Sequence, residues 1–148
     1  MPELLTIGYE ASTIAAVTEA LRAAGATLLI DVRAVPQSRK PGFSRRLLEG
    51  AMTGAGIGYL HLQPLGTPKA GRDAVRAGHP EVMERIYRAH IVGDAPQAAL
   101  AQARSLAAGQ RACLLCFERD PAHCHRRLVA EMIAADTGQT IVHLTPTA

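Results

Sequence analysis

The chain has few aromatic residues and no long apolar segment. Its 148 residues include no Trp, three Tyr and two Phe, so an aliphatic core is expected. No apolar run approaches the ~20 residues that a membrane-spanning helix needs. The start, MPELLTIGYE, lacks the basic patch and long apolar stretch of a signal peptide. We therefore expect a soluble, cytoplasmic protein with no membrane partner.

Cysteine is also scarce. The chain has three, an odd number, and two of them lie beside histidines, which argues against a disulfide framework and indicates a reducing compartment. A formal net charge of +3 allows phosphate or nucleic-acid partners without requiring them. The composition, 48% hydrophobic and 20% charged, excludes disorder. Without repeats or linkers, residues 1–148 are expected to form a single domain.

Short apolar runs alternate with helical patterns along the chain. The runs predict five strands, at residues 4–9, 27–33, 57–62, 112–118 and 140–144. Helices are expected after Ser12, from Ser44, and over residues 80–92, 96–108 and 121–136, with a surface loop at residues 66–78. Strands that are apolar on both faces and separated by helices indicate a three-layer, Rossmann-like α/β domain with a mostly parallel sheet.

Unusual polar residues collect after the predicted strands. In such sheets, ligands bind beyond the carboxyl ends of the strands. These ends and the loops after them carry Tyr9, Asp31, Arg33, Arg39, Lys40, His61, Cys116, Glu118, Cys124, His125 and Arg126. We therefore expect one edge of the sheet to hold the functional site.

The densest segment is residues 113–126, CLLCFERDPAHCHR. Side chains alternate between the faces of a strand, so Cys113 and Cys116 point to opposite sides and do not form a redox or zinc-binding pair. Cys113 is expected in the core. Glu118 shares a face with Cys116 at the predicted strand end.

Asp120 and Pro121 are typical of the start of a helix. The first two helical turns would then hold His123, Cys124, His125 and Arg126. A cysteine there has a stabilised thiolate, and the same place binds anions. The alternative is a purely structural role, in which Cys124 and His125 extend the buried face of the helix. A third reading is a metal site with ligands among Cys116, Cys124, His125 and His123; no cofactor is predicted.

The second predicted strand ends in IDVR and leads into a basic loop. Asp31 and Arg33 form either a structural ion pair or a clamp for a substrate. The loop adds Arg39, Lys40, Arg45 and Arg46, which suit a phosphate, a carboxylate or a nucleic-acid backbone, or simply a solvated surface.

Four segments, TIGYE, LIDVRAVPQSRKPGF, GIGYLHLQPLG and LLCFERDPAHCHR, occur in this order along the chain. Together they resemble the domain of unknown function 488 family. The resemblance implies functional positions at Asp31, Arg33, Ser38, Arg39, His61, Cys116, Glu118, Cys124, His125 and Arg126. The chain has Leu65-Gly66-Thr67 where many members have Leu-Gly-Gly. The resemblance implies a fold and a site but no reaction.

The leading hypothesis is a small enzyme acting on an anionic or phosphate-bearing substrate, such as a nucleotide or nucleic acid. Its site would consist of binding residues, an acid or base and a nucleophile: Asp31, Arg33, Arg39, His61, Arg126 and Tyr9 for binding, Glu118 or His125 as the acid or base, and Cys124 as the nucleophile. One rival is a non-catalytic nucleic-acid-binding adaptor that uses residues 33–46. The other is a metal-binding protein. No pattern predicts an oligomeric state.

Overall fold

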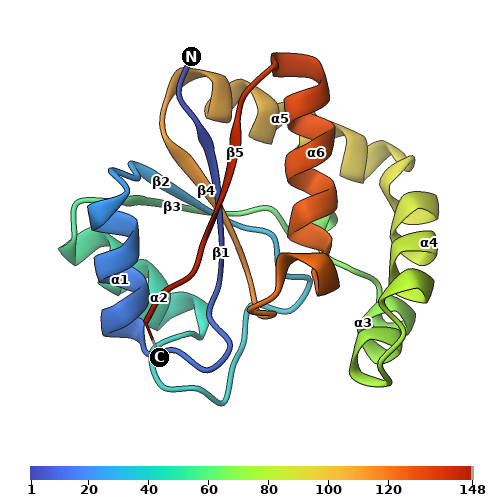
Figure 1. Ribbon diagram of the computed structural model, residues 1–148, viewed down its shortest axis with the longest axis horizontal. Helices are drawn as coiled ribbons and strands as arrows, with labels where there is room; N and C mark the ends of the chain where they lie inside the picture. The colour runs from blue at the N-terminus through green and yellow to red at the C-terminus, as the bar shows by residue number, and fades with distance from the viewer. Residues whose placement is uncertain (148) are drawn as a thin grey trace.

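Five parallel strands form one sheet at the centre of the computed structural model, which describes residues 1–147 (Figure 1). The strands are β1 (Leu4–Gly8), β2 (Leu28–Asp31), β3 (Gly58–His61), β4 (Ala112–Cys116) and β5 (Ile141–Leu144). Their order in the sheet is β3-β2-β4-β1-β5. This confirms the expected Rossmann-like three-layer α/β fold.

Helices cover both faces of the sheet (Figure 1). One face carries α1 (Ile14–Ala23) and α2 (Arg45–Gly54); the other carries α5 (Asp94–Gly109) and α6 (His125–Thr137). Beside α6 lies α4 (Pro80–Ile91), on which α3 (Lys69–Arg76) packs, and two short 3₁₀ turns are η1 (Gln63–Leu65) and η2 (Pro121–His123). None of the helices in the described residues is long and apolar enough to cross a membrane.

The sheet separates two apolar layers. The layer under α1 and α2 contains Leu21, Leu29 and Cys113, whereas the layer under α4, α5 and α6 contains Leu128 and Cys116. Cys113 and Cys116 therefore lie on opposite faces of β4, as the alternation of a strand predicts. Most of both layers is aliphatic, which agrees with the scarcity of aromatic residues.

The loop expected at residues 66–78 is wrong, because most of this segment is helix α3. Its Gly and Pro residues serve packing and helix initiation here. A side chain at Gly71 would place its Cβ 2.5 Å from Cγ2 of Thr67, so glycine lets the helix lie against that residue. Pro68 occupies the N-cap position of α3.

The start of α1 is also one residue later than predicted. Thr13, and not Ser12, is the N-cap, because its Oγ1 accepts a hydrogen bond from the backbone N–H of Ala16 at 3.1 Å. Ser12 is buried and donates instead to the carbonyl of Thr147. Ser44 is the N-cap of α2, as predicted.

The winding of the chain brings the ends of the central strands together. β4 pairs with both β1 and β2, so Cys116 lies beside Gly8 and Asp31 lies beside Leu115. The loops after β1 and β2 lead to helices on one face, whereas the loop after β4 leads to α6 on the other. Loops that part in this way leave a crevice at the carboxyl edge, where ligands bind in such folds.

Candidate functional site

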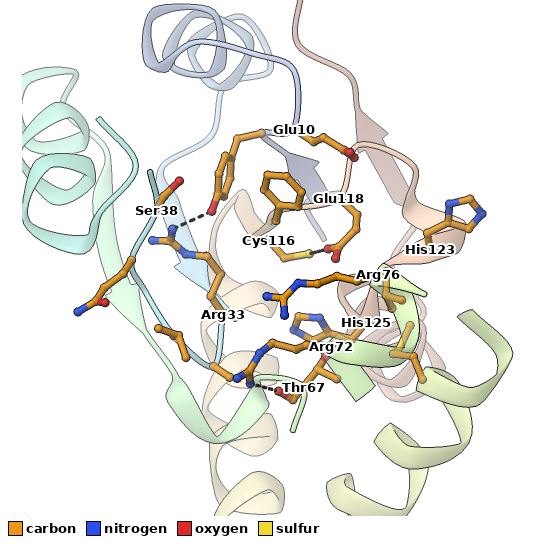
Figure 2. Close-up of a pocket in the computed structure, with 17 residues that line it drawn as sticks. Glu10, Arg33, Ser38, Thr67, Arg72, Arg76, Cys116, Glu118, His123 and His125 are labelled. Carbon is orange, nitrogen blue, oxygen red and sulfur yellow. Dashed lines mark hydrogen bonds between the residues drawn. The ribbon is translucent and has the colours of Figure 1, made fainter. Parts of the chain in front are cut away.

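A pocket of about 750 Å³ lies at this edge. The loops after three strands line it: Tyr9 and Glu10 follow β1, Arg33 follows β2, and Cys116 and Glu118 lie at and after the end of β4. Further lining comes from α3, through Arg72 and Arg76, and from the turn η2 and the first residue of α6, through His123 and His125 (Figure 2). Of the residues predicted at the strand ends and in the loops after them, five line this pocket: Tyr9, Arg33, Cys116, Glu118 and His125.

The wall formed by β4 contains a sulfur atom beside a carboxyl group. Oε2 of Glu118 lies 3.2 Å from Sγ of Cys116 (Figure 2). Burial raises the pKa of Glu118, and the nearby charge of Glu10 raises it further, whereas Arg126 and Arg76 act in the opposite direction. A raised pKa makes this carboxyl group a candidate general acid or base.

The side chain of Arg126 holds the loop of residues 117–123, which we call the 117–123 loop. Its guanidinium is fully buried and donates to the carbonyls of Glu118 and Arg119 and to Oγ1 of Thr6. Burial lowers the pKa of Arg126. Because its donors are directed at the protein itself, Arg126 supports the pocket from behind and does not line it.

Gly8 allows the 117–123 loop to approach β1. A Cβ at this position would lie 1.8 Å from the carbonyl oxygen of Glu118. The loop is held further by the backbone N–H of Arg119, which donates to Oε1 of Glu10 at 2.9 Å. Asp120 caps the turn η2 by accepting from the N–H of Ala122. These contacts hold Glu118 in the lining of the pocket.

The single helix expected over residues 121–136 is broken at Cys124. The turn η2 ends at His123, Cys124 is extended, and α6 begins at His125 with Cys124 as its N-cap. The extended residue turns its side chain back toward the end of β4. The 3₁₀ turn and the extended residue therefore bring Cys124 to Cys116, which a continuous helix would not do.

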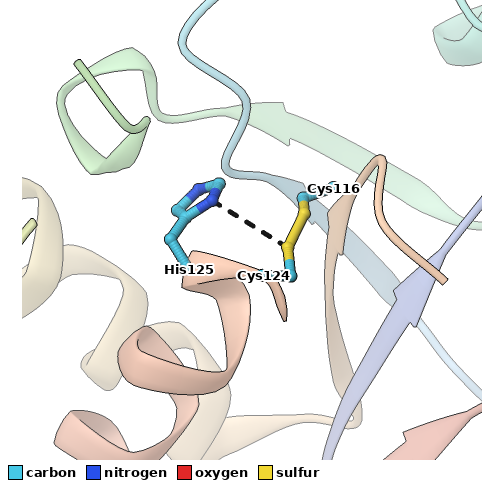
Figure 3. Close-up of side chains that lie close together, drawn as sticks. All are labelled: Cys116, Cys124 and His125. Atoms are coloured by element: carbon cyan, nitrogen blue, oxygen red, sulfur yellow. Dashed lines mark hydrogen bonds between the residues drawn. A yellow bond between two sulfur atoms is a disulfide. The ribbon is translucent and has the colours of Figure 1, made fainter. Parts of the chain in front are cut away.

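Cys116 and Cys124 are joined in a disulfide (Figure 3). The expectation that an odd number of cysteines argues against disulfides is wrong for this pair. The number of cysteines does not reveal that the 117–123 loop folds back on β4 and brings the two sulfur atoms together. Cys113 is free and fully buried. In this oxidised state, Cys124 has no thiolate to act as a nucleophile.

His125 lies against the disulfide with its ring fixed. Its Nε2 is 2.7 Å from the carbonyl oxygen of Val32, which can only accept, so Nε2 carries the proton. Nδ1 then presents its lone pair to Sγ of Cys124, 3.9 Å away (Figure 3). Burial lowers the pKa of His125 to about 4, so the imidazole is neutral near pH 7.

The same three side chains bear on the metal hypothesis. Ligand atoms of Cys116, Cys124 and His125 lie within 4.8 Å of one another. Metal ions bind cysteine as the thiolate. The sulfur atoms of the disulfide are therefore not metal ligands, and the arrangement could accept an ion only after reduction.

Asp31 and Arg33 form a buried ion pair. Nε and Nη2 of Arg33 donate to the two carboxylate oxygens of Asp31 at 2.9 and 2.7 Å. Nη1 donates to the hydroxyl of Tyr9 (Figure 2) and to the carbonyl of Phe43, and Tyr59 donates to Asp31. Arg33 borders the pocket, but four of its five side-chain N–H donors already bind Asp31, Tyr9 and the carbonyl of Phe43, which favours a structural ion pair over a substrate clamp.

The other predicted binding residues lie in different places. Tyr9 lines the pocket with its ring stacked on Phe43. His61 lies outside the pocket lining, with Nε2 2.7 Å from the carbonyl oxygen of Arg33. Arg39 is exposed and also lies outside it, although its neighbour Ser38 lines the pocket.

Two functional candidates escaped the sequence analysis. Arg72 and Arg76 line the pocket from α3; Arg76 reaches toward Cys116, whereas Arg72 lies beside Thr67 (Figure 2). Their spacing of four residues places them on one face of a helix, and this was the available signal. It was missed because the Gly and Pro residues around them were taken to indicate a loop.

Comparison with known proteins gives one match. The family model described as "Domain of unknown function DUF488" matches residues 13–133, which is most of the chain and includes β2, β3, β4 and the greater part of α6. No curated protein and no solved structure matches the chain.

Proposed function

Since the chain belongs to the DUF488 family, whose description names no reaction, we propose a function from the pocket itself. The protein is a small enzyme that binds an anionic substrate between α3 and the end of β4. The observation that carries this proposal is the meeting of Arg72 and Arg76 with Glu118 in one pocket. Guanidinium groups on one side and a proton-transferring carboxyl group on the other suit chemistry on an anion.

Arg72 and Arg76 replace the arginines that the sequence favoured for binding. The side chain of Arg76 is 74% exposed, and its Nη1 meets Asp73 at 3.3 Å. Arg72 is half-buried and donates through Nη1 to the carbonyl of Thr67. Each guanidinium has five N–H donors, so both keep donors for a phosphate or carboxylate.

Apolar side chains border the same space. Phe117 and Val35 line the pocket and are 43% and 49% exposed. A substrate with an apolar or planar part beside its negative charge would cover them. This combination favours a small organic phosphate or carboxylate over an inorganic ion as the natural substrate.

Thermal unfolding in the presence of inorganic phosphate, followed by a panel of small organic phosphates and carboxylates, tests the binding half of the proposal. Binding to the folded state raises the midpoint. We expect Arg72→Gln and Arg76→Gln to weaken affinity about tenfold each, since a hydrogen bond to a charged group contributes roughly 1.5–3 kcal/mol. Arg85→Gln, an exposed change on α4 outside the pocket, is the matched control. Equal affinities in all four proteins would contradict the proposal.

Glu118→Gln tests the catalytic half. Once a ligand from the panel is found to be turned over, this variant should bind it but lose about 10²–10⁴-fold in rate, the usual contribution of general acid–base catalysis. Undiminished turnover would remove Glu118 from the mechanism.

The adaptor hypothesis makes a different prediction from the same preparations. Arg39, Arg45 and Arg46 are exposed on the loop before α2 and at its start. If they bind a nucleic-acid backbone, affinity for a short oligonucleotide falls steeply with salt and is insensitive to Arg76→Gln. Tight oligonucleotide binding with no binding of small anions would favour the adaptor over the enzyme.

A further inference from the structure

Both cysteines of the disulfide are almost fully buried, and they differ in whether they border the pocket. Cys116 lines the pocket, whereas Cys124 lies outside the lining and faces His125 (Figures 2 and 3). A thiolate that enters from the pocket therefore meets Sγ of Cys116 first. Attack on that sulfur would make Cys124 the leaving group.

The surroundings of Cys124 suit a leaving thiolate. It is the N-cap of α6, and no acidic residue occupies the first turn of this helix. Free backbone N–H groups at a helix start stabilise a thiolate. Nδ1 of His125, with its lone pair toward the sulfur, can accept a hydrogen bond from Cys124 once the thiol is protonated.

The surroundings of Cys116 suit a thiol that must gain or lose a proton. Oε2 of Glu118 lies 3.2 Å from its sulfur, within the range of a hydrogen bond to sulfur. In the reduced protein the S–H of Cys116 can donate to this carboxylate. A protonated Glu118 can give its proton to a Cys116 thiolate as that thiolate forms.

The disulfide is not needed to close the 117–123 loop. Arg126 binds the carbonyls of Glu118 and Arg119, and Arg119 donates further to Glu10 and to the carbonyl of Pro146. These contacts would persist with the sulfur–sulfur bond open. The loop can therefore keep the two cysteines close in both redox states.

We propose that Cys116 and Cys124 form a thiol–disulfide exchange site that reacts with dithiols entering the pocket, with Cys116 as the attacked sulfur. One thiolate of the dithiol attacks Sγ of Cys116, the bond between the cysteines breaks, and its electron pair leaves with Cys124. The second sulfur of the dithiol then attacks the mixed disulfide and displaces the thiolate of Cys116. The dithiol is oxidised to a disulfide, the protein pair is reduced, and the two protons of the dithiol end on the two cysteines, one of them through Glu118.

This activity concerns the same pocket but does not depend on the anionic substrate, so it would stand if phosphate failed to bind. Reduction of the folded full-length protein by excess dithiothreitol, followed by acid quenching, denaturation and alkylation, measures it. We expect Cys116 and Cys124 to be converted together from the disulfide to two thiols, and oxidised dithiothreitol to reverse the change. A pair that opens only after the protein is unfolded would be a purely structural disulfide and would overturn the proposal.

Single-cysteine variants test which sulfur is attacked. With oxidised glutathione, Cys124→Ser should form a mixed disulfide at Cys116, located by peptide mass mapping. Cys116→Ser should react at Cys124 at least tenfold more slowly, with fully buried Cys113 as the unreactive internal reference in both variants. Equal rates, or faster reaction at Cys124, would overturn the assignment.

Two further measurements separate exchange from other roles. Glu118→Gln retains the shape of the side chain but has no acidic proton, so it should slow reduction of the pair about tenfold while leaving the reduced product the same. Elemental analysis of the reduced wild-type protein should find no stoichiometric zinc or iron. A tightly held metal ion would mean that the reduced sulfurs serve coordination, and the exchange proposal would fail.

Discussion

The buried pair of Asp31 and Arg33 shows how much one residue's surroundings decide about its role. Asp31 is fully buried and accepts from the backbone N–H and two side-chain nitrogens of Arg33. Tyr59 supplies a further hydrogen bond at 2.6 Å. With all these partners, the carboxylate is compensated within the protein and has no capacity left for a substrate.

Removing the carboxylate from this pair should destabilise the protein strongly. Asp31→Ala leaves the Arg33 charge buried without its partner, which costs about 3–5 kcal/mol in comparable cases. Urea unfolding of the purified variant measures the loss. Asp73→Ala, which removes an exposed carboxylate paired with Lys69 and Arg76, is the control and should leave the midpoint unchanged. Similar losses of stability in both variants would show that the buried ion pair stabilises the fold no more than the exposed one.

At the scale of elements, the connection from β4 to α6 determines the geometry of the site. A strand end, a 3₁₀ turn, one extended residue and a helix start follow one another within a short segment. The close approach of this connection to β1 depends on Gly8, where any side chain would collide with the carbonyl of Glu118. A single methyl group should therefore displace the whole loop.

Gly8→Ala should destabilise the protein by about 1–3 kcal/mol or more, the usual cost of overpacking. It should also move Glu118 away from Cys116. Gly50→Ala on α2 is the matched control, because beyond the helix's own nearby backbone no atom of the described residues lies within 4 Å of the added Cβ. Since alanine favours a helix interior over glycine, the control should gain roughly 0.5–1 kcal/mol. Chemical unfolding of the two variants measures these changes in stability. A Gly8→Ala protein as stable as the wild type would refute the close approach of the 117–123 loop to β1.

At the scale of the whole molecule, buried ionisable groups make the stability depend on pH. His125 is neutral in the folded protein, with its pKa lowered to about 4 by burial, whereas an unfolded histidine has a pKa near 6.5. Tyr87, Arg126, Asp31 and the bound Cys124 surround it. Glu118 has a raised pKa, so its titration changes the free energy of unfolding in the opposite direction.

Acid should therefore destabilise the protein through His125. Between pH 6.5 and 4 the unfolded chain binds a proton at this position that the folded protein does not, so the free energy of unfolding falls as the pH falls, by on the order of 3 kcal/mol. Urea unfolding at a series of pH values measures the slope, and His125→Gln should flatten it. In Glu118→Gln the slope should become steeper, because the raised pKa of Glu118 favours the folded state at the acidic end. An unchanged slope in His125→Gln would show that the imidazole is not buried as the structure has it.

The sequence by itself determined the layered architecture. Strands that are apolar on both faces can be buried only in a sheet covered on both sides, and such strands can be recognised from their local composition. The same reasoning placed Cys113 in the core, because side chains alternate along any strand. The resemblance to the DUF488 family rested on ordered local motifs in the same way and was confirmed.

Only the tertiary structure decided what the candidate residues contact. Arg33, Arg126 and Glu118 look alike as charged residues near strand and helix ends, but the two arginines are held by internal hydrogen bonds, whereas the carboxyl group of Glu118 lies in the pocket lining. Helix α3 with Arg72 and Arg76, and the disulfide between Cys116 and Cys124, depend on contacts between segments distant in the chain or on a loop that folds back. Within segment 113–126, long-range packing, which no local pattern encodes, put Cys116 and Glu118 in the lining of the pocket and left Cys124 and Arg126 outside it.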